Sequence, residues 1–345
     1  MKQNASSRWA LWLAPLAFAA VSGGCNSSTT QGAGLTSDKA CSDFATAQCN
    51  KLEQCEKNGI AARYGDTVTC LSRQKFSCMN GIEAPGTGNT PTTLEACVAA
   101  LLPDAAVAYD CADYINSNPP VACQAQTGTL ANGQACAFNA QCKTAFCAIV
   151  KGSNCGLCAE PPKAGDPCSS VTNCGYALVC SGETQLCMKW GASGDSCAKG
   201  AGTCAYGLGC AVAANQTTGT CQPWAKLGAA CGTKATPPLL CDNSEGLACV
   251  KGLCIVASEV HPGQPCGNLT TTGADAGTFA LCSAASTCNS PDAGVTGTCA
   301  GPAADNQSCD TVADVGCMIP ARCVGTATDA GVTGTCQLPT GAACH

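Results

Sequence analysis

Large aromatic side chains are scarce in this chain of 345 residues, which contains four Trp, five Tyr and six Phe. Two of the four tryptophans, Trp9 and Trp12, lie in an apolar stretch close to the N-terminus. A chain of this length can bury a sizeable core, but this composition cannot fill one with the usual large apolar residues. The stability of the folded chain must therefore come from another source.

Histidine is almost absent, with only His261 and His345. A Ser-His-Asp or Cys-His site needs an imidazole base held in place by a third group, whereas His261 lies in a linker-like segment and His345 is the last residue. The sequence also lacks G-x-S-x-G, P-loop and H-E-x-x-H motifs. We therefore predict that the protein is not an enzyme and that it has no cofactor and no metal site.

Positive charge is also scarce, with 17 Lys and Arg against 23 Asp and Glu. No basic patch is present, which argues against nucleic acid as a partner and against electrostatic binding to anionic lipid.

Cysteine, in contrast, is abundant, with 35 residues in the chain. This frequency is typical of disulfide scaffolds. Each bridge contributes roughly 2–5 kcal/mol in small secreted domains, and such bridges persist only in oxidising compartments. We therefore expect an exported, extracellular or surface-exposed protein.

The N-terminus agrees with export. Lys2 and Arg8 precede a short apolar run, so residues 1–24 are predicted to be a signal peptide. Ser22-Gly23-Gly24 before Cys25 resembles a bacterial lipobox, although Ser22 stands where Leu is usual; an ordinary secretory leader is the alternative. We expect a lipid on Cys25, a polar tether over residues 25–37, and an outer-membrane or cell-surface location. Without Cys25, 34 cysteines remain, an even number that allows 17 disulfides.

Residues 38–125 are predicted to form an α-helical domain with eight cysteines and four bridges. Ser37 is expected to cap a first helix that ends at Asn58-Gly59. Three more helices are expected, over 67–79 with a stop at Asn80-Gly81, over 93–102, and over 105–115.

Residues 130–345 are predicted to form a tandem array of short β-hairpin and loop modules, each held by disulfides. Each repeat begins at an anchor cysteine, and a glycine stands three positions before it. The exception is the anchor Cys309, where Asn306 replaces the glycine; asparagine also tolerates the left-handed conformation. The anchors are Cys136, Cys168, Cys197, Cys231, Cys266, Cys309 and Cys344.

Most repeats contain four cysteines, which allow three pairings that the sequence cannot distinguish. The string DAGVTGTC, at 292–299 and 329–336, predicts a hairpin turn at Asp-Ala-Gly. The first repeat has a fifth cysteine and Cys344 stands alone. Either Cys344 pairs with the preceding repeat, or the array is a truncated longer one.

Three further features are candidates for chemistry. Asp110 and Asp113 are one helical turn apart, as a carboxylate pair could be, but a solvated helix start is favoured. Cys155 and Cys158 form a C-x-x-C string, for which structural disulfides are favoured over redox or zinc roles. Trp190 and Trp224 each stand three residues after the fourth cysteine of a repeat, and repeated aromatics are potential binding anchors. The alternative is that each indole covers a disulfide or packs between neighbouring repeats.

The repeated Gly-x-x-Cys…Cys…Leu-x-Cys…Cys pattern behind a lipobox resembles the cysteine-rich lipoproteins of myxobacterial-type genomes, whose repeats are likened to the Dickkopf N-terminal cysteine-rich domain. The string CxxFAxxxCxKLxxC, from Cys41 to Cys55, looks like the domain that often precedes such repeats. The resemblance implies a fold type and a surface location, but no Dickkopf-type signalling.

Together these features predict a non-enzymatic cell-surface lipoprotein that serves as a structural, adhesion or recognition scaffold. Its partners would be the membrane, through the lipid, and an unknown protein or glycan. The alternative is a secreted disulfide-rich protease inhibitor, because rigid loops can present a substrate-like segment.

Overall fold

The computed structural model describes residues 34–102, 105, 109–168, 174–181, 184–198, 203–213, 215–232, 235, 238–269, 279–289, 296–313, 315–328 and 331–344. The predicted signal peptide, Cys25 and most of the tether lie outside these ranges. The helices and the repeats belong to one compact unit that extends from Leu35 to His345.

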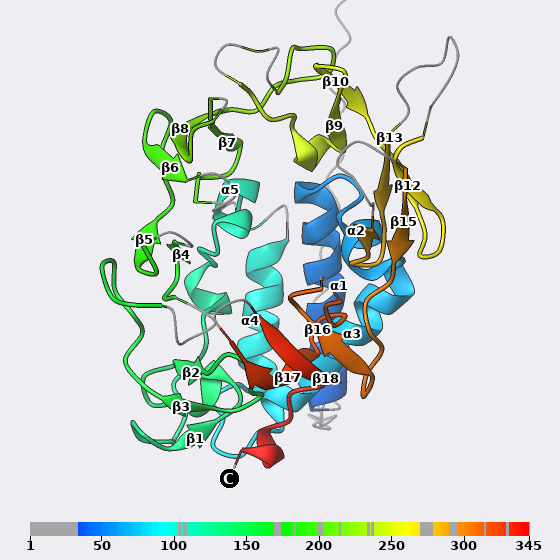
Figure 1. Cartoon of the computed structure of the whole chain (residues 1–345). Helices are drawn as coiled ribbons and strands as arrows, with labels where there is room; N and C mark the ends of the chain where they lie inside the picture. The colour runs from blue at the N-terminus through cyan, green and yellow to red at the C-terminus, as the bar shows by residue number, and fades with distance from the viewer. Residues whose placement is uncertain are drawn as a thin grey trace, which may run out of the picture. The chain divides into compact units, whose positions relative to one another are not determined.

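The N-terminal part of this unit is helical, as predicted (Figure 1). Its helices are α1 (Ser37–Cys55), α2 (Gly59–Tyr64), α3 (Thr67–Ile82), α4 (Pro91–Leu101) and α5 (Cys111–Ile115), followed by the 3-10 turn η1 (Val121–Cys123). Side-chain oxygens of Thr36, Asp66, Thr90 and Asp110 cap the N-termini of α1, α3, α4 and α5.

Several predicted helix boundaries were wrong. The cap of α1 is Thr36 rather than Ser37, which is already helical. The first helix ends at Cys55, and Asn58, at φ 62°, starts the additional helix α2 instead of ending α1. Helix α3 continues through Asn80-Gly81, because glycine is tolerated inside a helix when packing favours it.

The fourth predicted helix is much shorter than expected. Residues 105, 109 and 110 are not helical, and α5 begins only at Cys111. Asp110 accepts a hydrogen bond from the Asp113 amide at 2.8 Å, which fixes the start of the helix at this point.

Eight cysteines join the helices through four bridges, as predicted: Cys41–Cys78, Cys49–Cys70, Cys55–Cys111 and Cys97–Cys123. Helix α1 lies against both α3 and α4. Its buried face includes Cys41, Ala45, Leu52 and Cys55, while Phe44 is half-buried.

The repeats form six modules, numbered here from their anchor cysteines Cys136, Cys168, Cys197, Cys231, Cys266 and Cys309. Module 1 contains β1 (Ala135–Cys136), β2 (Cys147–Ile149) and β3 (Gly156–Cys158), and module 2 contains β4 (Leu178–Cys180) and β5 (Cys187–Lys189). Module 3 contains β6 (Ser196–Ala198), β7 (Leu208–Ala211) and β8 (Thr218–Pro223), and module 4 contains β9 (Leu247–Val250) and β10 (Leu253–Val256). Module 5 contains β11 (Ser258–Val260), β12 (Pro265–Asn268), β13 (Phe279–Cys282), β14 (Thr287–Asn289) and β15 (Gly297–Ala300), and module 6 contains β16 (Ser308–Asp310), β17 (Arg322–Ala327) and β18 (Val332–Gln337).

These strands pair mainly as antiparallel hairpins, as expected. In modules 1, 3 and 6 the last strand of the module lies between its other two strands, in the orders β1-β3-β2, β6-β8-β7 and β16-β18-β17. Strands β17 and β18 form the hairpin predicted at the second DAGVTGTC string, with Ala327 opposite Val332. The turn residues Asp329 and Ala330 lie outside the described residues.

In module 1 the first cysteine pairs with the third and the second with the fifth, Cys158, because the fourth, Cys155, bonds elsewhere. In modules 2 to 6 the first cysteine pairs with the third and the second with the fourth. The third and fourth cysteines face each other across a strand pair, for example Cys210 and Cys221. Sulfur atoms from the two bridges approach within 4.8 Å, so the bridges pack against each other and form much of the core of the module.

The anchor glycines have the predicted left-handed conformation. Gly133, Gly165, Gly194, Gly228 and Gly263 have φ between 76° and 94°, and Asn306 has φ 66°. The seventh anchor is different, because Gly341 has no positive φ and begins the 3-10 turn η4 (Gly341–Ala343). Cys344 therefore does not start a seventh module.

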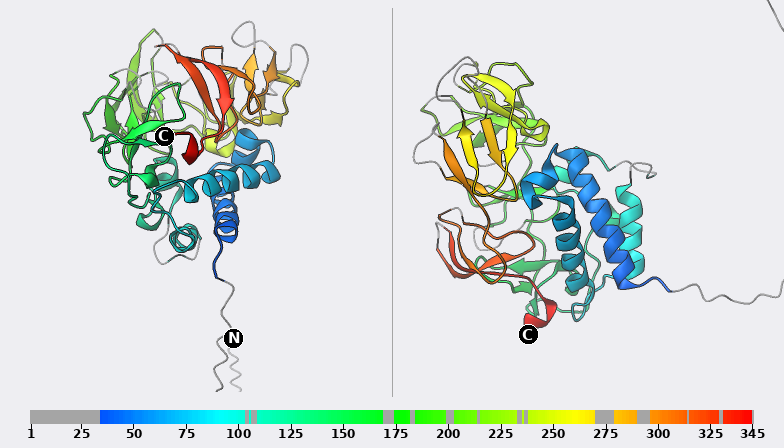
Figure 2. Two further views of the ribbon diagram at one scale, coloured as in Figure 1. Left: turned by 90° about the horizontal axis from the view of Figure 1, so that it is seen from below. Right: turned by 90° about the vertical axis from the view of Figure 1, so that its right-hand side faces the viewer.

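The modules are attached to the helical region rather than standing in a free row. Figures 1 and 2 show their strands beside the helices. In modules 2 to 5 the contact falls two or three residues after the second cysteine. It consists of backbone hydrogen bonds from Ala177 N to Ser117 O, from Lys57 N to Ser244 O, and from Ala284 N to Ala61 O, and of a bond from Tyr206 N to Asn116 Oδ1.

Modules 1 and 6 reach the helical region in other ways. Gly88 N donates to Ala140 O at 2.7 Å in module 1. Before module 6, Asp305 accepts a bidentate pair of hydrogen bonds from Arg73 of α3, at 2.8–3.0 Å. All six modules are thus tied to the same helical region.

Of the two alternatives that the sequence left open for Cys344, pairing with the preceding repeat was wrong. Cys344 bonds to Cys155 of module 1, across a sequence separation of 189 residues. Module 6 lies beside module 1, because Gly325 N donates to Gly152 O at 2.9 Å and Arg322 donates to Asn154 O at 3.0 Å. The array is therefore closed by a bridge between its first and last parts.

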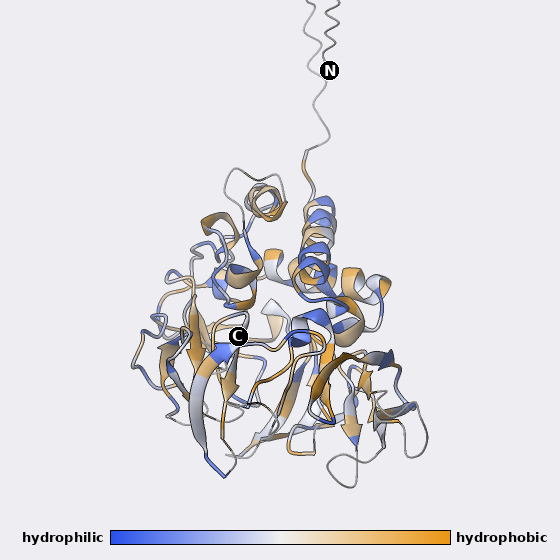
Figure 3. Cartoon of the chain, turned by 90° about the horizontal axis from the view of Figure 1, so that it is seen from above, coloured by the Kyte–Doolittle hydropathy of each residue, from blue (hydrophilic) through white to orange (hydrophobic). Residues whose placement is uncertain are grey.

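Hydrophobic residues are scattered over helices and modules alike (Figure 3). Among the described residues, no helix is both long and apolar enough to span a membrane. The 17 disulfides use all 34 cysteines of the described ranges and fit an exported or extracellular protein.

Candidate functional site

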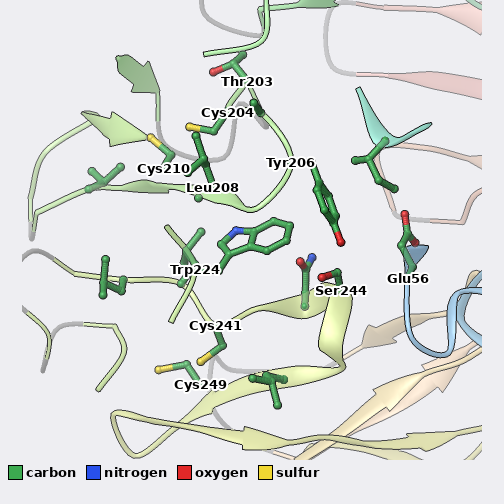
Figure 4. Close-up of a pocket in the computed structure, with 18 of the residues that line it drawn as sticks. Glu56, Thr203, Cys204, Tyr206, Leu208, Cys210, Trp224, Cys241, Ser244 and Cys249 are labelled. Atoms are coloured by element: carbon green, nitrogen blue, oxygen red, sulfur yellow. The ribbon is translucent and has the colours of Figure 1, made fainter. Parts of the chain in front are cut away.

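The described part of the chain contains a half-open pocket of about 1000 Å³. It is lined by the linkers after modules 2 and 3, by β7 of module 3, by module 4, and by helix residues on one side. Figure 4 shows the side chains that face it. Its volume is at the upper end of the roughly 300–1000 Å³ that is typical of ligand sites.

Trp224 forms the aromatic wall of the pocket together with Tyr206. The two rings meet edge to face, with centroids 5.8 Å apart and an interplanar angle of 83°. Gly209 of β7 lies directly under the indole. A Cβ atom at Gly209 would lie 2.9 Å from Trp224 Cδ1 and 3.0 Å from Leu240 Cδ1, so only glycine allows this close packing.

Trp190 lines the same pocket from the linker between modules 2 and 3. It is half-buried, and its Nε1 is buried without a hydrogen-bond partner among the described residues. Both tryptophans predicted as binding anchors therefore meet at one site. The packing alternative also describes Trp224 in part, because its ring lies between Gly209 of module 3 and Leu240 of module 4.

The opposite wall is a short turn of module 4 that is fixed by a buried carboxylate. Asp242 accepts hydrogen bonds from Ser244 N at 3.1 Å and Ser244 Oγ at 2.5 Å, and it pairs with Lys226 at 2.7 Å. The turn is η3 (Asn243–Glu245). Burial pushes the pKa of Asp242 upward, but the hydrogen bonds from Lys226 and Ser244 outweigh this effect and hold the pKa below its usual value.

The rim on the helix side carries one ion pair, between Arg63 of α2 and Glu56 at the end of α1. Tyr206 Oη donates a hydrogen bond to Cys55 O at 3.4 Å, which holds the ring between the pocket and the helices. Because Arg63 and Glu56 neutralise each other, and Asp242 is paired with Lys226, the pocket has little net charge.

Sequence reasoning missed most of this site. Tyr206 has no motif of its own, and only its position two residues after Cys204, where module 5 also contacts the helical region, distinguishes it. Gly209 and Leu240 gave no signal, because their role depends on the contact between two modules.

The remaining candidates of the sequence lie elsewhere and do not converge. Cys155 and Cys158 belong to two different bridges, with Cys344 and Cys142, so the C-x-x-C string is structural, as favoured. Of the two histidines, His261 Nδ1 lies 3.2 Å from Ser283 Oγ. The Ser283 residue is only 1% exposed, so a substrate carbonyl cannot reach its oxygen.

Groups of three cysteines with metal-ligand distances occur in the modules, for example Cys197, Cys204 and Cys221. In the oxidised protein these sulfur atoms are all part of disulfides and offer no thiolate. Asp110 and Asp113 act within α5, where Asp110 caps the helix.

The pocket can therefore accommodate an apolar group, and the carboxylate of Glu56 in its lining is paired with Arg63. Cys25, the predicted lipidation site, lies outside the described residues. The chain matches no protein-family model, no curated protein and no solved structure.

Proposed function

We propose that this protein is a non-enzymatic recognition scaffold of the cell surface, tethered through a lipid on Cys25, which binds a partner in the pocket lined by Trp190 and Trp224. One observation carries the proposal. Trp190 and Trp224 are the two tryptophans that remain after the predicted leader, and both line one open, largely apolar pocket. Elsewhere the modules are packed mainly with cysteine.

The disulfides support a recognition role because they fix the pocket before binding. Modules 3 and 4 each have two bridges, and both are hydrogen-bonded to the helical region. A rigid site loses little conformational entropy when its partner binds, so more of the contact energy appears as affinity.

The tether is supported by the cysteine count. All 34 cysteines from Cys41 to Cys344 are paired with one another, so none of them is left to form a disulfide with Cys25. The polar residues between Cys25 and α1 would serve as the tether.

The tether is tested by the intact mass of protein extracted from native membranes and alkylated without reduction, followed by mapping of N-terminal peptides. We expect a diacyl or triacyl mass on Cys25 and no alkylated thiol. A lipid-free N-terminus would contradict the anchor, and alkylated thiols would contradict the fully bridged scaffold.

Recognition is tested with the mature protein carrying Cys25→Ser, applied to glycan and peptide arrays. The informative variant is Leu240→Arg, which places a charge in the pocket. Its matched control is Leu253→Arg, because Leu240 is 52% exposed and Leu253, in the same module, is 51% exposed but does not line the pocket. Binding that is lost only in Leu240→Arg supports the proposal, and binding unaffected by both variants places the site elsewhere.

The non-enzymatic part of the proposal is tested separately with a panel of ester, peptide and glycoside substrates. Turnover that survives purification and is lost in His261→Ala would contradict it. Slow cleavage at one loop by a target protease would instead favour the inhibitor alternative.

A further inference from the structure

Strand β7 has a free edge beside the pocket. Within the β6-β8-β7 sheet, Cys221 of β8 donates from its N–H to Asp195 O and accepts at its C=O from Gly194 N, both at 2.8 Å. The backbone groups of Cys221 therefore point towards β6 and away from β7. Cys210 is directly opposite Cys221 on β7. In an antiparallel pair of this type both residues point their backbone groups outward, so Cys210 N–H and C=O face the free edge.

These edge groups have no backbone partner within the described residues. Neither Cys210 nor Val212, the residue that follows the strand, takes part in a backbone hydrogen bond outside the strand pairing. An unpaired strand edge is a template for a further strand. Both residues also line the pocket, so the free edge and the apolar walls belong to one surface.

The pocket walls favour an uncharged, apolar group. Leu208, Leu240 and Trp224 form most of the surface next to β7, and the ionic groups at the rim are paired with each other. A sugar ring would bury several hydroxyl groups, each of which needs a partner. Among the described lining residues, the hydroxyl and amide groups are those of Thr203, Tyr206, Asn243 and Ser244. The Tyr206 hydroxyl already donates to Cys55 O, so the walls suit a sugar poorly.

Resting on the proposed function, we propose that the partner is a polypeptide whose extended segment pairs with the free edge of β7 and places a large uncharged apolar side chain between Trp224 and Leu240. Backbone hydrogen bonds to Cys210 supply register, and the pocket supplies specificity, which is the usual division in peptide recognition by strand addition. Strand β7 is only four residues long, so a short segment is sufficient.

The probe is a library of linear random peptides displayed on phage and selected on the mature Cys25→Ser protein. Binding is measured through protein fluorescence, because Trp190 and Trp224 are the only tryptophans after the leader and both line the site. Tryptophan-free peptides are used for this measurement. We expect selected sequences that share one large apolar residue and carry no charge beside it.

Two comparisons decide the proposal. Leu240→Arg should weaken binding of a selected peptide at least tenfold, and Leu253→Arg should leave it unchanged. N-methylation of single peptide amides should then have alternating effects. We expect about a tenfold loss, equivalent to about 1.4 kcal/mol, at amides that pair with β7, and little loss at their neighbours, because only the paired amides lose a backbone hydrogen bond.

Two results would overturn it. Equal effects of N-methylation at every amide, or none, would exclude strand pairing. Failure to select any peptide sensitive to Leu240→Arg, together with glycan-array binding that is sensitive to it, would exclude a polypeptide while leaving the pocket as a recognition site. Failure on both arrays would reject the proposed function as well.

Discussion

Replacing both Cys155 and Cys344 with alanine opens the bridge that closes the array. The two residues are 189 positions apart. In the unfolded but oxidised chain the bridges of modules 2 to 6 stay closed, and they shorten the path between the two residues to roughly 100 residues. The chain-entropy model gives about 4.7 kcal/mol for closing a loop of that length. A path twice as long would add only about 0.6 kcal/mol.

The assay is equilibrium unfolding in guanidinium chloride without reductant, followed by tryptophan fluorescence. Trp190 and Trp224 stand outside modules 1 and 6, so they report unfolding at a distance in sequence from the opened bridge. We expect the double variant to lose about 3–5 kcal/mol of unfolding free energy. The matched control is Cys168→Ala with Cys180→Ala, which opens a loop of 12 residues, for which the same model gives only about 3 kcal/mol.

An unchanged tryptophan transition in the Cys155→Ala, Cys344→Ala protein would refute this reasoning. It would mean that modules 2 to 4 unfold independently of the closure, and that the contacts between modules and helices do not couple them. A loss smaller than that of the short-loop control would lead to the same conclusion.

Three further predictions concern the attachment of the modules. In a double-mutant cycle with Arg73→Ala and Asp305→Ala, we expect a coupling of about 1.5–3 kcal/mol, because the bidentate pair is only 16% and 31% exposed; additive effects would exclude it. Asp242 has a depressed pKa in the folded protein, so its stabilisation is complete above its unfolded pKa of about 3.9 and is lost as the pH falls through the folded value; Asp242→Asn should flatten the acid limb of a stability–pH curve. Gly128→Ala should cost about 1–3 kcal/mol in denaturant unfolding, because its Cβ would lie 2.2 Å from Gln141 O, and an unchanged midpoint would contradict this contact.

The sequence predicts local features well where one residue type is required. The left-handed anchors are an example, because glycine or asparagine is needed at each position and Asn306 was recognised as the exception. The four bridges of the helical region follow from an even number of cysteines in one segment. Helix ends were predicted less well, because Asn58-Gly59 is equally suited to end one helix and to start the next.

Other features depend on contacts that have no local signature. Ala145, Ala177 and Ala285 all have positive φ at the position three residues after the second cysteine of their modules, where Gly207 stands in module 3. Alanine there gives no sequence signal of a left-handed turn, since the conformation costs it roughly 1–2 kcal/mol. In modules 2 and 5 the turn is held by hydrogen bonds to the helical region, which the chain pattern cannot reveal.

The candidate site could be predicted only in part from the sequence, for the same reason. Trp190 and Trp224 were identified by their repeated position after a fourth cysteine, but their convergence depends on how modules 2, 3 and 4 are attached to the helices. Tyr206 connects the pocket with the helices. Its amide donates to Asn116 Oδ1 and its hydroxyl to Cys55 O, while its ring contacts Trp224.

The order of the modules along the chain is therefore set by the helical region and not by the repeat alone. Each of modules 2 to 5 contacts the helical region through the segment after its second cysteine, yet each finds a different partner: Ser117, Asn116, Lys57 and Ala61. A repeat moved to another position would keep its two bridges but lose this partner. In modules 3 and 4 the same segment also lines the pocket, through Tyr206 and Ser244. The attachment to the helices and the proposed recognition site therefore share residues, and the edge of β7 adjoins them next to Trp224.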